Sequence, residues 1–157
     1  MKIIIGSDKS GFSLKEQIKA DLISKGYEVS DKGTTDINNF MPYFTVAPII
    51  AKAIQKGEAD KGILICGTGA GMCIVANKFK GIYAVCVEGS YSARMSAVIN
   101  RANVLTMGGW VVAPEMGINM VNSWLNAEFA DGFPPERKVF LENAYNKVKD
   151  IEENLYK

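Results

Sequence analysis

The chain of 157 residues contains no histidine and only three cysteines, Cys66, Cys73 and Cys86. The absence of histidine excludes Ser-His and Cys-His nucleophile pairs, so acid–base chemistry must use carboxylate, thiol, lysine, tyrosine or water. The cysteines are odd in number and have no CxxC spacing, which argues against a zinc site and against a disulfide framework. The sequence therefore predicts a protein without a bound metal ion.

An excess of one charge and long apolar runs are also missing. Lysine and arginine total 18 against 17 acidic residues and are spread along the chain, so no basic stripe for a nucleic acid is expected. The N-terminal stretch MKIIIGSD has only three apolar residues between Lys2 and Gly6, too few for a signal peptide or a spanning helix. We expect a cytoplasmic protein that binds neither nucleic acid nor membrane.

Short β-branched runs alternate with longer segments of helical period in a chain that is 48% hydrophobic. The expected strands are residues 2–8, 27–31, 61–66, 82–87 and 103–108. The expected helices are one that carries Leu14, Ile18 and Leu22, and others over 43–56, 70–79, 91–101 and 115–127. This alternation predicts an α/β fold, a Rossmann-like doubly wound five-stranded parallel sheet with helices on both faces.

Three features mark expected helix boundaries. Ser13 and Glu16 have the spacing of a capping box at the start of the first helix, and Gly26 suits its exit. Pro48 should start, kink or shorten the helix predicted over 43–56, because proline cannot donate a backbone hydrogen bond.

The C-terminal segment differs from the rest. We expect one α/β domain over residues 1–133 and an amphipathic C-terminal helix over 134–157, after Pro134 and Pro135. The apolar stripe of this helix consists of Leu141, Ala144, Tyr145, Val148, Ile151 and Leu155. The stripe either packs on its own domain or contacts a partner subunit in a dimer.

Asp8 and Cys66 lie at the carboxyl ends of the first and third predicted strands. Ligands of parallel sheets bind beyond the carboxyl ends of the strands, so we expect both residues in one site. The N-terminus of the next helix would stabilise the Cys66 thiolate for use as a base, and Thr68 could donate its hydroxyl to developing negative charge. Cys73 and Cys86 are expected to be inert core residues.

The turn after Cys66 is rich in glycine. Gly67, Gly69 and Gly71 leave out Cβ atoms where backbone N–H groups could approach an anion, which favours an oxyanion or phosphate site. The spacing matches neither a Walker P-loop nor GxGxxG, because Met72 stands at the third glycine position. Two alternatives stay open: a tight turn without a ligand, and a dinucleotide site with Glu88 on the ribose.

At the level of longer motifs, the stretches GSDKSGFSLKE, ICGTGAG, ANKFKGI, YSA and NVLTMG resemble the family of B-type ribose-5-phosphate isomerases and galactose-6-phosphate isomerase subunits. The resemblance runs from residue 1 to about residue 130. It implies aldose–ketose isomerisation of a sugar phosphate through an enediolate, without a cofactor. It also implies a homodimer or higher homo-oligomer with sites at the subunit interface, the alternative being a related second subunit.

The resemblance assigns roles to individual residues. Cys66 stands at the position of the base, while Thr68 and the amides of the glycine turn hold the enediolate. Asp8 stands at a position that binds substrate hydroxyls. Asn100 stands where the family has the asparagine of a His-Asn pair.

Departures from the family pattern concern the substrate. Lys9 replaces a histidine, as in one galactose-6-phosphate isomerase subunit, and Ile99 replaces the histidine that assists ring opening. Trp110 and Phe133 stand where the family has phosphate-gripping arginines, and only Arg137 persists. The sequence thus predicts an isomerase for a substrate other than ribose 5-phosphate, such as an open-chain tetrose phosphate or a six-carbon ketose phosphate.

Less specific interpretations remain beside these assignments. Asp8 could simply cap the following helix, Lys9 and Arg137 could be solvated surface charges, and Asn100 could be a helix-end residue. The alternative function is a non-catalytic subunit or module that binds a phosphosugar. Arg101 is a further candidate to replace the lost positive charge.

Overall fold

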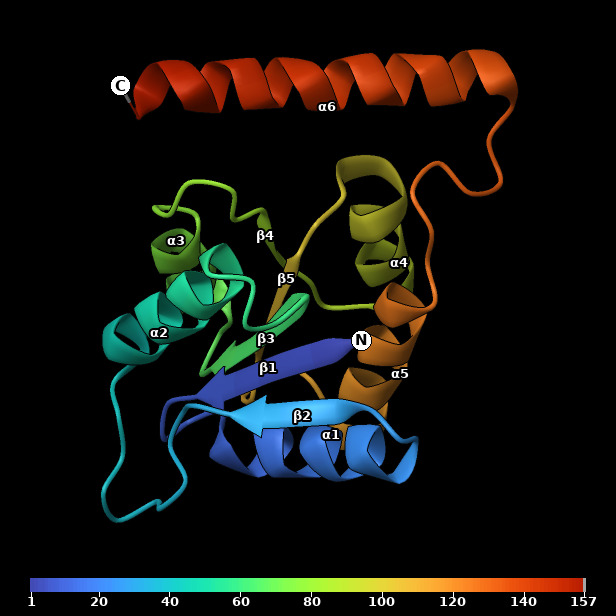
Figure 1. The fold of residues 1–157 in the computed structure, drawn as a ribbon. Helices are drawn as coiled ribbons and strands as arrows, with labels where there is room; N and C mark the ends of the chain where they lie inside the picture. The colour runs from blue at the N-terminus through green and yellow to red at the C-terminus, as the bar shows by residue number, and fades with distance from the viewer. Residues whose placement is uncertain (157) are drawn as a thin grey trace.

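The computed structural model describes residues 1–156, which form a five-stranded parallel sheet with the order β2-β1-β3-β5-β4 (Figure 1). The strands are β1 (Lys2–Ser7), β2 (Glu28–Asp31), β3 (Lys61–Cys66), β4 (Ala84–Cys86) and β5 (Val104–Gly108). The helices are α1 (Phe12–Ser24), α2 (Tyr43–Gln55), α3 (Ala70–Ala76), α4 (Ser90–Asn100), α5 (Pro114–Leu125) and α6 (Pro135–Leu155). The predicted doubly wound α/β fold is confirmed.

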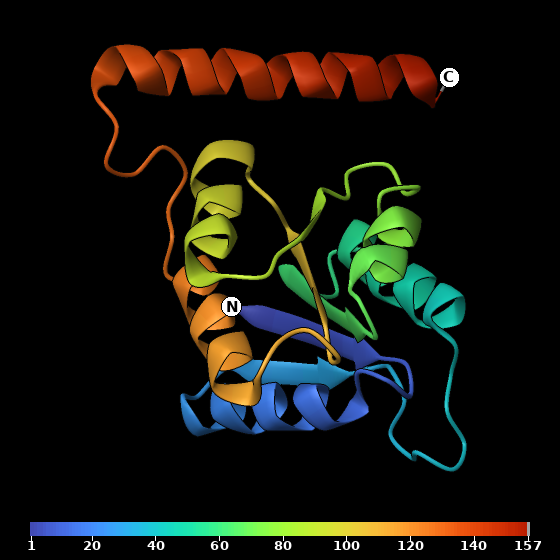
Figure 2. The same cartoon turned by 180° about the vertical axis from the view of Figure 1, so that it is seen from behind.

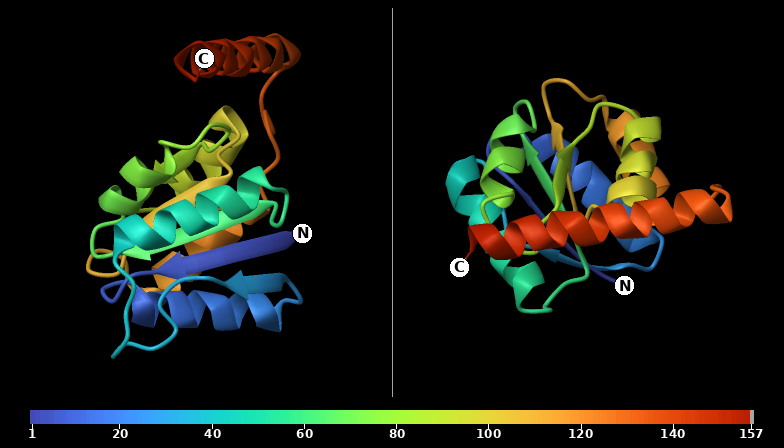
Figure 3. Two further views of the ribbon diagram at one scale, coloured as in Figure 1. Left: turned by 60° about the vertical axis from the view of Figure 1, so that its left-hand side comes forward. Right: turned by 90° about the horizontal axis from the view of Figure 1, so that it is seen from above.

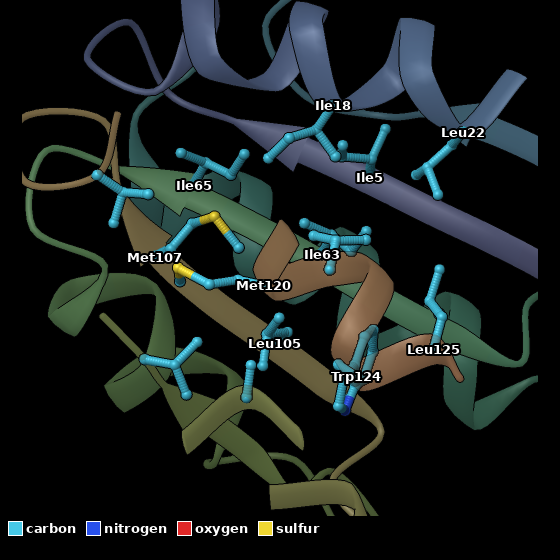
Figure 4. Packing of buried hydrophobic residues seen from close by; sticks show 14 of the residues in the cluster. Ile5, Ile18, Leu22, Ile63, Ile65, Leu105, Met107, Met120, Trp124 and Leu125 are labelled. Carbon is cyan, nitrogen blue, oxygen red and sulfur yellow. The ribbon is translucent and has the colours of Figure 1, made fainter. Parts of the chain in front are cut away.

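Two apolar cores lie on opposite faces of the sheet, as the two layers of helices in Figures 2 and 3 suggest. Ile3 and Ile5 point to the face covered by α1, α4 and α5, while Ile4 points to the face covered by α2 and α3. Figure 4 shows the first core, where Trp124 of α5 packs near Leu105 of β5. Both faces of the strands are therefore buried, which explains their continuous apolar runs.

The order of the strands places the topological switch point between β1 and β3. The chain leaves β1 towards β2 on one side and returns to β3 on the other, and β1 pairs with β3 from Ile3 to Ser7. The backbone N–H of Asp8 continues this pairing by donating to the Ile65 carbonyl at 3.2 Å. Ligand sites of such sheets form where the two strands end, because the loops diverge there.

The first helix begins differently from the prediction. Helix α1 starts at Phe12 after Gly11 and has no side-chain cap, so Ser13 lies inside the helix and the expected capping box is wrong. The Asp8 carboxylate instead accepts a hydrogen bond from the Gly11 N–H at 3.0 Å. Gly26 adopts a φ of +81° at the exit, as expected from its lack of a Cβ. Pro48 lies inside α2, which neither starts nor ends there.

Helix α6 lies across the side of the molecule that carries β4 and α4 (Figures 1 and 3). Among the described residues of this helix, only Leu141 is buried. Glu152 holds its C-terminal half by accepting hydrogen bonds from the Gly81 N–H at 2.7 Å and the Tyr83 hydroxyl at 3.1 Å. Much of the predicted apolar stripe is left exposed, including Val148, Ile151 and Leu155. No helix within residues 1–156 is long and apolar enough to cross a bilayer.

A buried lysine ties α1 to the end of β2. Lys15 is fully buried, and its ammonium donates to the Asp31 carboxylate and to the Thr34 carbonyl at 2.6 Å. Lys19 donates to the same carboxylate at 2.9 Å. Burial alone would raise the pKa of Asp31, but the hydrogen bonds from Lys15 and Lys19 lower it.

We predict that Lys15→Met destabilises the fold by about 3 kcal/mol at neutral pH, because a half-buried carboxylate loses its main partner. The pKa of Asp31 is depressed in the folded state, so its stabilisation exists above the unfolded pKa of about 3.9 and disappears as the pH falls further. The cost of the substitution should therefore shrink in acid. Lys25→Met is the control, since Lys25 pairs with Asp21 at the surface and should cost at most about 0.5 kcal/mol. Urea unfolding of the three proteins between pH 7 and pH 3 measures both effects, and an equal cost at both pH values would contradict the ion-pair account.

Candidate active site

A cavity of about 250 Å³ opens at the carboxyl ends of β1 and β3, at the switch point of the sheet. Its lining consists of Asp8, Ser10, Tyr43, Cys66, Gly67, Thr68, Gly71 and Trp110. Five of these residues, Asp8, Cys66, Gly67, Thr68 and Gly71, are site residues expected from the sequence. The pairing of β1 with β3 thus brings Asp8 and Cys66, which are 58 positions apart in the chain, to one small cavity.

The Cys66 side chain ends β3 at the floor of this cavity. It is 5% exposed, and its sulfur accepts a hydrogen bond from the Gly69 N–H at 3.1 Å. The Gly69 amide therefore fixes the direction in which the sulfur points. Thr68 is exposed beside it, and its hydroxyl oxygen lies 3.4 Å from the Ala70 nitrogen. A nucleophilic or basic sulfur and a hydroxyl donor therefore face the same space.

The conformation of Gly69 makes the bond to the sulfur possible. Its φ is +83°, and a Cβ at this position would lie 2.7 Å from the backbone carbon of Met107. The Gly69 carbonyl accepts a hydrogen bond from the buried Thr106 hydroxyl at 3.0 Å. Strand β5 thus fixes the turn from behind, and Gly69 itself supports the cavity without lining it.

Asp8 serves the fold and the cavity at once. One carboxylate oxygen accepts the hydrogen bond from Gly11, as a helix-start residue would. The other oxygen has no hydrogen bond within residues 1–156, and the half-buried side chain lines the cavity. The capping role and a role in binding hydroxyl groups are therefore compatible.

Two aromatic side chains form walls of the cavity: Tyr43, which no sequence pattern assigned to the site, and Trp110, which stands where the family has a phosphate-gripping arginine. Tyr43 covers Gly71, and Trp110 covers Gly67, where a Cβ would lie 2.7 Å from the indole ring. The Trp110 loop is fixed by a hydrogen bond from its N–H to the Gly67 carbonyl at 3.0 Å. Because Trp110 follows the carboxyl end of β5, the rule that pointed to Asp8 and Cys66 could have indicated it too.

Other predicted residues lie elsewhere in a single chain. Lys9 is exposed next to the cavity, with its ammonium 5.3 Å from the centre of the Phe40 ring. Asn100 and Arg137 line a second cavity of about 490 Å³ between β4, α4 and α6, together with Ile99. The two cavities share no lining residue.

Tyr83 and Arg101 both contact α6, Tyr83 through Glu152 and Arg101 through Glu142. Burial and the neighbouring Glu152 carboxylate raise the pKa of Tyr83, which stays protonated as the donor to that carboxylate. Arg101 stacks on Phe129 and Tyr145 and pairs with Glu142. Its charge is therefore paired within the chain, and a role of Arg101 in replacing a lost phosphate ligand stays a prediction.

The expectation that Cys86 lies in the core is wrong. Cys86 ends the short edge strand β4, where its side chain is exposed and its sulfur lies 3.7 Å from the Thr68 carbonyl oxygen. Cys73 is half-buried in α3, with its sulfur 3.4 Å from the Ala84 carbonyl oxygen. Within residues 1–156, no three acidic or cysteine side chains are grouped to hold a metal ion.

Comparison with known proteins identifies the fold and the family. The family model described as Ribose/Galactose Isomerase matches residues 3–140, which is most of the chain. The chain belongs to the ribose/galactose isomerase family. The resemblance predicted from the sequence motifs is therefore confirmed, and the chain is an aldose–ketose isomerase of the sugar-phosphate isomerase family.

Three relatives of this isomerase are informative. The 4-deoxy-4-sulfo-D-erythrose isomerase of Clostridium sp. (strain MSTE9) is 52% identical over all of this chain and 99% of its own length. D-erythrulose-4-phosphate isomerase 2 of Mycolicibacterium smegmatis is 42% identical, covering 82% of this chain and 86% of its own. The structure of Clostridium thermocellum ribose-5-phosphate isomerase B superposes with a TM-score of 0.89 at 41% identity, with 99% of each chain covered.

For this isomerase we predict that Gly69→Ala costs more stability than Gly26→Ala. The two glycines have nearly the same φ, +83° and +81°, but only at Gly69 would a Cβ collide with backbone. Gly26→Ala should cost about 1–2 kcal/mol from the left-handed conformation alone, and Gly69→Ala should exceed it. Urea unfolding measures the difference, and equal costs would mean that the turn relaxes freely.

Proposed function

We propose that this protein works as a cytoplasmic homodimer that interconverts the aldose and ketose forms of a four-carbon sugar with an anionic group on C4. Cys66 acts as the base. The observation that carries this proposal is the Cys66 sulfur, which accepts a hydrogen bond from Gly69 in a cavity that also presents Asp8 and Thr68. These groups suffice for proton transfer without histidine or metal.

The reaction moves one proton between neighbouring carbons. The Cys66 thiolate removes the proton from C2 of the aldose, and the electron pair forms the C1–C2 double bond of an enediolate as the carbonyl oxygen gains negative charge. Thr68 donates its hydroxyl to that charge, and the free oxygen of Asp8 accepts from a substrate hydroxyl. Cys66 then returns its proton to C1, while a hydroxyl proton passes from O2 to O1, which completes the ketose.

Ile99 supports a substrate that does not need ring opening. To open, a cyclic sugar must lose a proton from its anomeric hydroxyl and gain one on its ring oxygen, and an isoleucine can move neither. A four-carbon sugar with its C4 position occupied by an anionic group has no hydroxyl there to close a furanose. The names of two relatives, a sulfoerythrose isomerase and an erythrulose-4-phosphate isomerase, agree with such a substrate.

A second copy of the chain would complete the site. Asn100 and Arg137 line a different cavity from Cys66 within one chain, and the apolar side chains of α6 are largely exposed. We infer that α6 and the end of α4 are covered by the partner, so that the partner's copies of these two residues meet the substrate. Exposed apolar surface of this kind is typical of subunit interfaces.

Cys66→Ala should lower kcat for D-erythrose 4-phosphate by roughly 10²–10⁴-fold, the usual contribution of a general base, with little effect on folding or ligand binding. Deuterium incorporation from heavy water detects the enediolate directly. Cys86→Ala is the matched control, because it removes an exposed thiol that does not line the cavity and should retain full exchange. Ribose 5-phosphate should exchange more slowly than the tetrose phosphate in the wild-type protein. Undiminished exchange by Cys66→Ala would refute the assignment of the base.

The composite site can be tested by mixing two inactive variants. Cys66→Ala and Arg137→Ala homodimers should each be impaired, whereas a heterodimer formed after subunit exchange contains one site with both native residues. Activity should therefore reappear on mixing, in proportion to the heterodimer detected by native mass spectrometry. If heterodimers form and remain inactive, Cys66 and Arg137 do not meet across the interface.

A further inference from the structure

Trp110 is a large aromatic side chain that a rigid loop holds in an exposed position beside Cys66. The indole is 75% exposed, yet its backbone N–H is bonded to the Gly67 carbonyl, and the preceding Gly109 N–H is bonded to the Cys66 carbonyl at 2.7 Å. No hydrogen bond to the indole N–H is present within residues 1–156. An apolar wall with one unused neutral donor therefore stands beside the cavity, on a loop that two backbone hydrogen bonds hold.

We propose that Trp110 makes this isomerase selective for a substrate that ends in a monoanionic sulfonate rather than a phosphate dianion. This inference rests on the proposed function, because it assumes that C1 and C2 of a four-carbon sugar lie at Cys66. Only two carbon–carbon bonds then separate C2 from C4, so the C4 group must pass the rim formed by Trp110 and Tyr43. Trp110 is thus a specificity-determining residue in contact with the head group.

The charges assigned to the site favour a head group with fewer negative charges. Asp8 is the charged residue among those that line the cavity. Lys9 stands beside it, and Arg137 of the partner subunit, which stacks on aromatic rings and has no carboxylate partner within the described residues, is the second cation. With the proposed Cys66 thiolate, these groups carry two positive and two negative charges, so every negative charge on the head group lacks a cation of its own and a dianion is disfavoured more than a monoanion.

The chemistry of the two head groups leads to the same choice. A phosphate ester carries nearly two charges at pH 7, since its second pKa is about 6. It is also joined to C4 through an oxygen, which would place a polar atom against the indole face. A sulfonate carries one charge, and its sulfur is bonded directly to C4 without a bridging oxygen. The C4 methylene can therefore pack on Trp110 while a sulfonate oxygen accepts a hydrogen bond from the indole N–H.

The test compares kcat/KM for 4-deoxy-4-sulfo-D-erythrose and D-erythrose 4-phosphate in four proteins. The wild type should favour the sulfonate by about tenfold or more. Trp110→Arg should shift the ratio towards the phosphate, and Trp110→Phe, which keeps the wall without the donor, should retain the preference at a lower rate. Met116→Arg adds the same charge at an exposed apolar residue of α5 outside the cavity and should leave the ratio unchanged.

A pH series provides a second measurement that does not depend on any variant. Lowering the pH from 8 to 5.5 converts the phosphate into a monoanion, so kcat/KM for the phosphate should rise relative to that for the sulfonate. Both substrates contact the same protein groups, so the ratio of the two kcat/KM values reports only the change in charge of the phosphate. Equal or phosphate-favouring kcat/KM in the wild type, or an unchanged ratio in Trp110→Arg, would overturn this inference while deuterium exchange still supports the isomerase. Absence of exchange with both sugars would instead refute the proposed function.

Discussion

The hydrogen bond from the Gly69 amide to the Cys66 sulfur sets the geometry on which the rest of the site depends. It requires a left-handed conformation at Gly69, and that conformation leaves no room for a Cβ against Met107 of β5. The same turn is bonded to the Thr106 hydroxyl and to the loop that carries Trp110. The sulfur, the hydroxyl donor and the aromatic wall are therefore positioned by one set of backbone contacts, and a shift in the turn would displace all three together.

The proposed site has two halves, Cys66 with Asp8 and the partner's Asn100 with Arg137, and the fold fixes the first half more firmly than the second. Cys66 and Asp8 follow central strands whose neighbours are buried on both faces, so the fold itself fixes their positions. Asn100 and Arg137 lie beside the edge strand β4, where α6 buries only Leu141. Edge strands with exposed backbone groups are surfaces on which another chain can pack. On this view, assembly would both order the second half and bring it to the first, so that activity and subunit association depend on each other.

The strands and helices could be predicted from sequence because their signal is local. Consecutive apolar residues in β1 and β3 indicate strands buried on both faces, and the carboxyl-end rule then places Asp8 beside Cys66. The start of α1 could not be predicted in the same way, because the Asp8 side chain takes the role expected of Ser13. The contact of Trp110 with Gly67 could not be predicted, because it arises from the pairing of β5 with β3, which brings together residues 43 positions apart. The burial predicted for Cys86 failed because β4 is short and lies at the edge of the sheet.

The distribution of burial explains how such a scaffold can change its substrate without losing its chemistry. Groups that move or stabilise the proton are held by backbone hydrogen bonds and buried strands, so the fold fixes their positions. Trp110 and Lys9 are exposed, and Ile99 is only half-buried beside a cavity, so exchanges at these positions cost little packing energy. Charge and shape at the rim can therefore vary almost independently of the turn that holds Cys66. A change from a dianionic to a monoanionic head group needs only the loss of rim cations, whereas the proton transfer at C2 stays the same for every substrate whose first two carbons reach the sulfur.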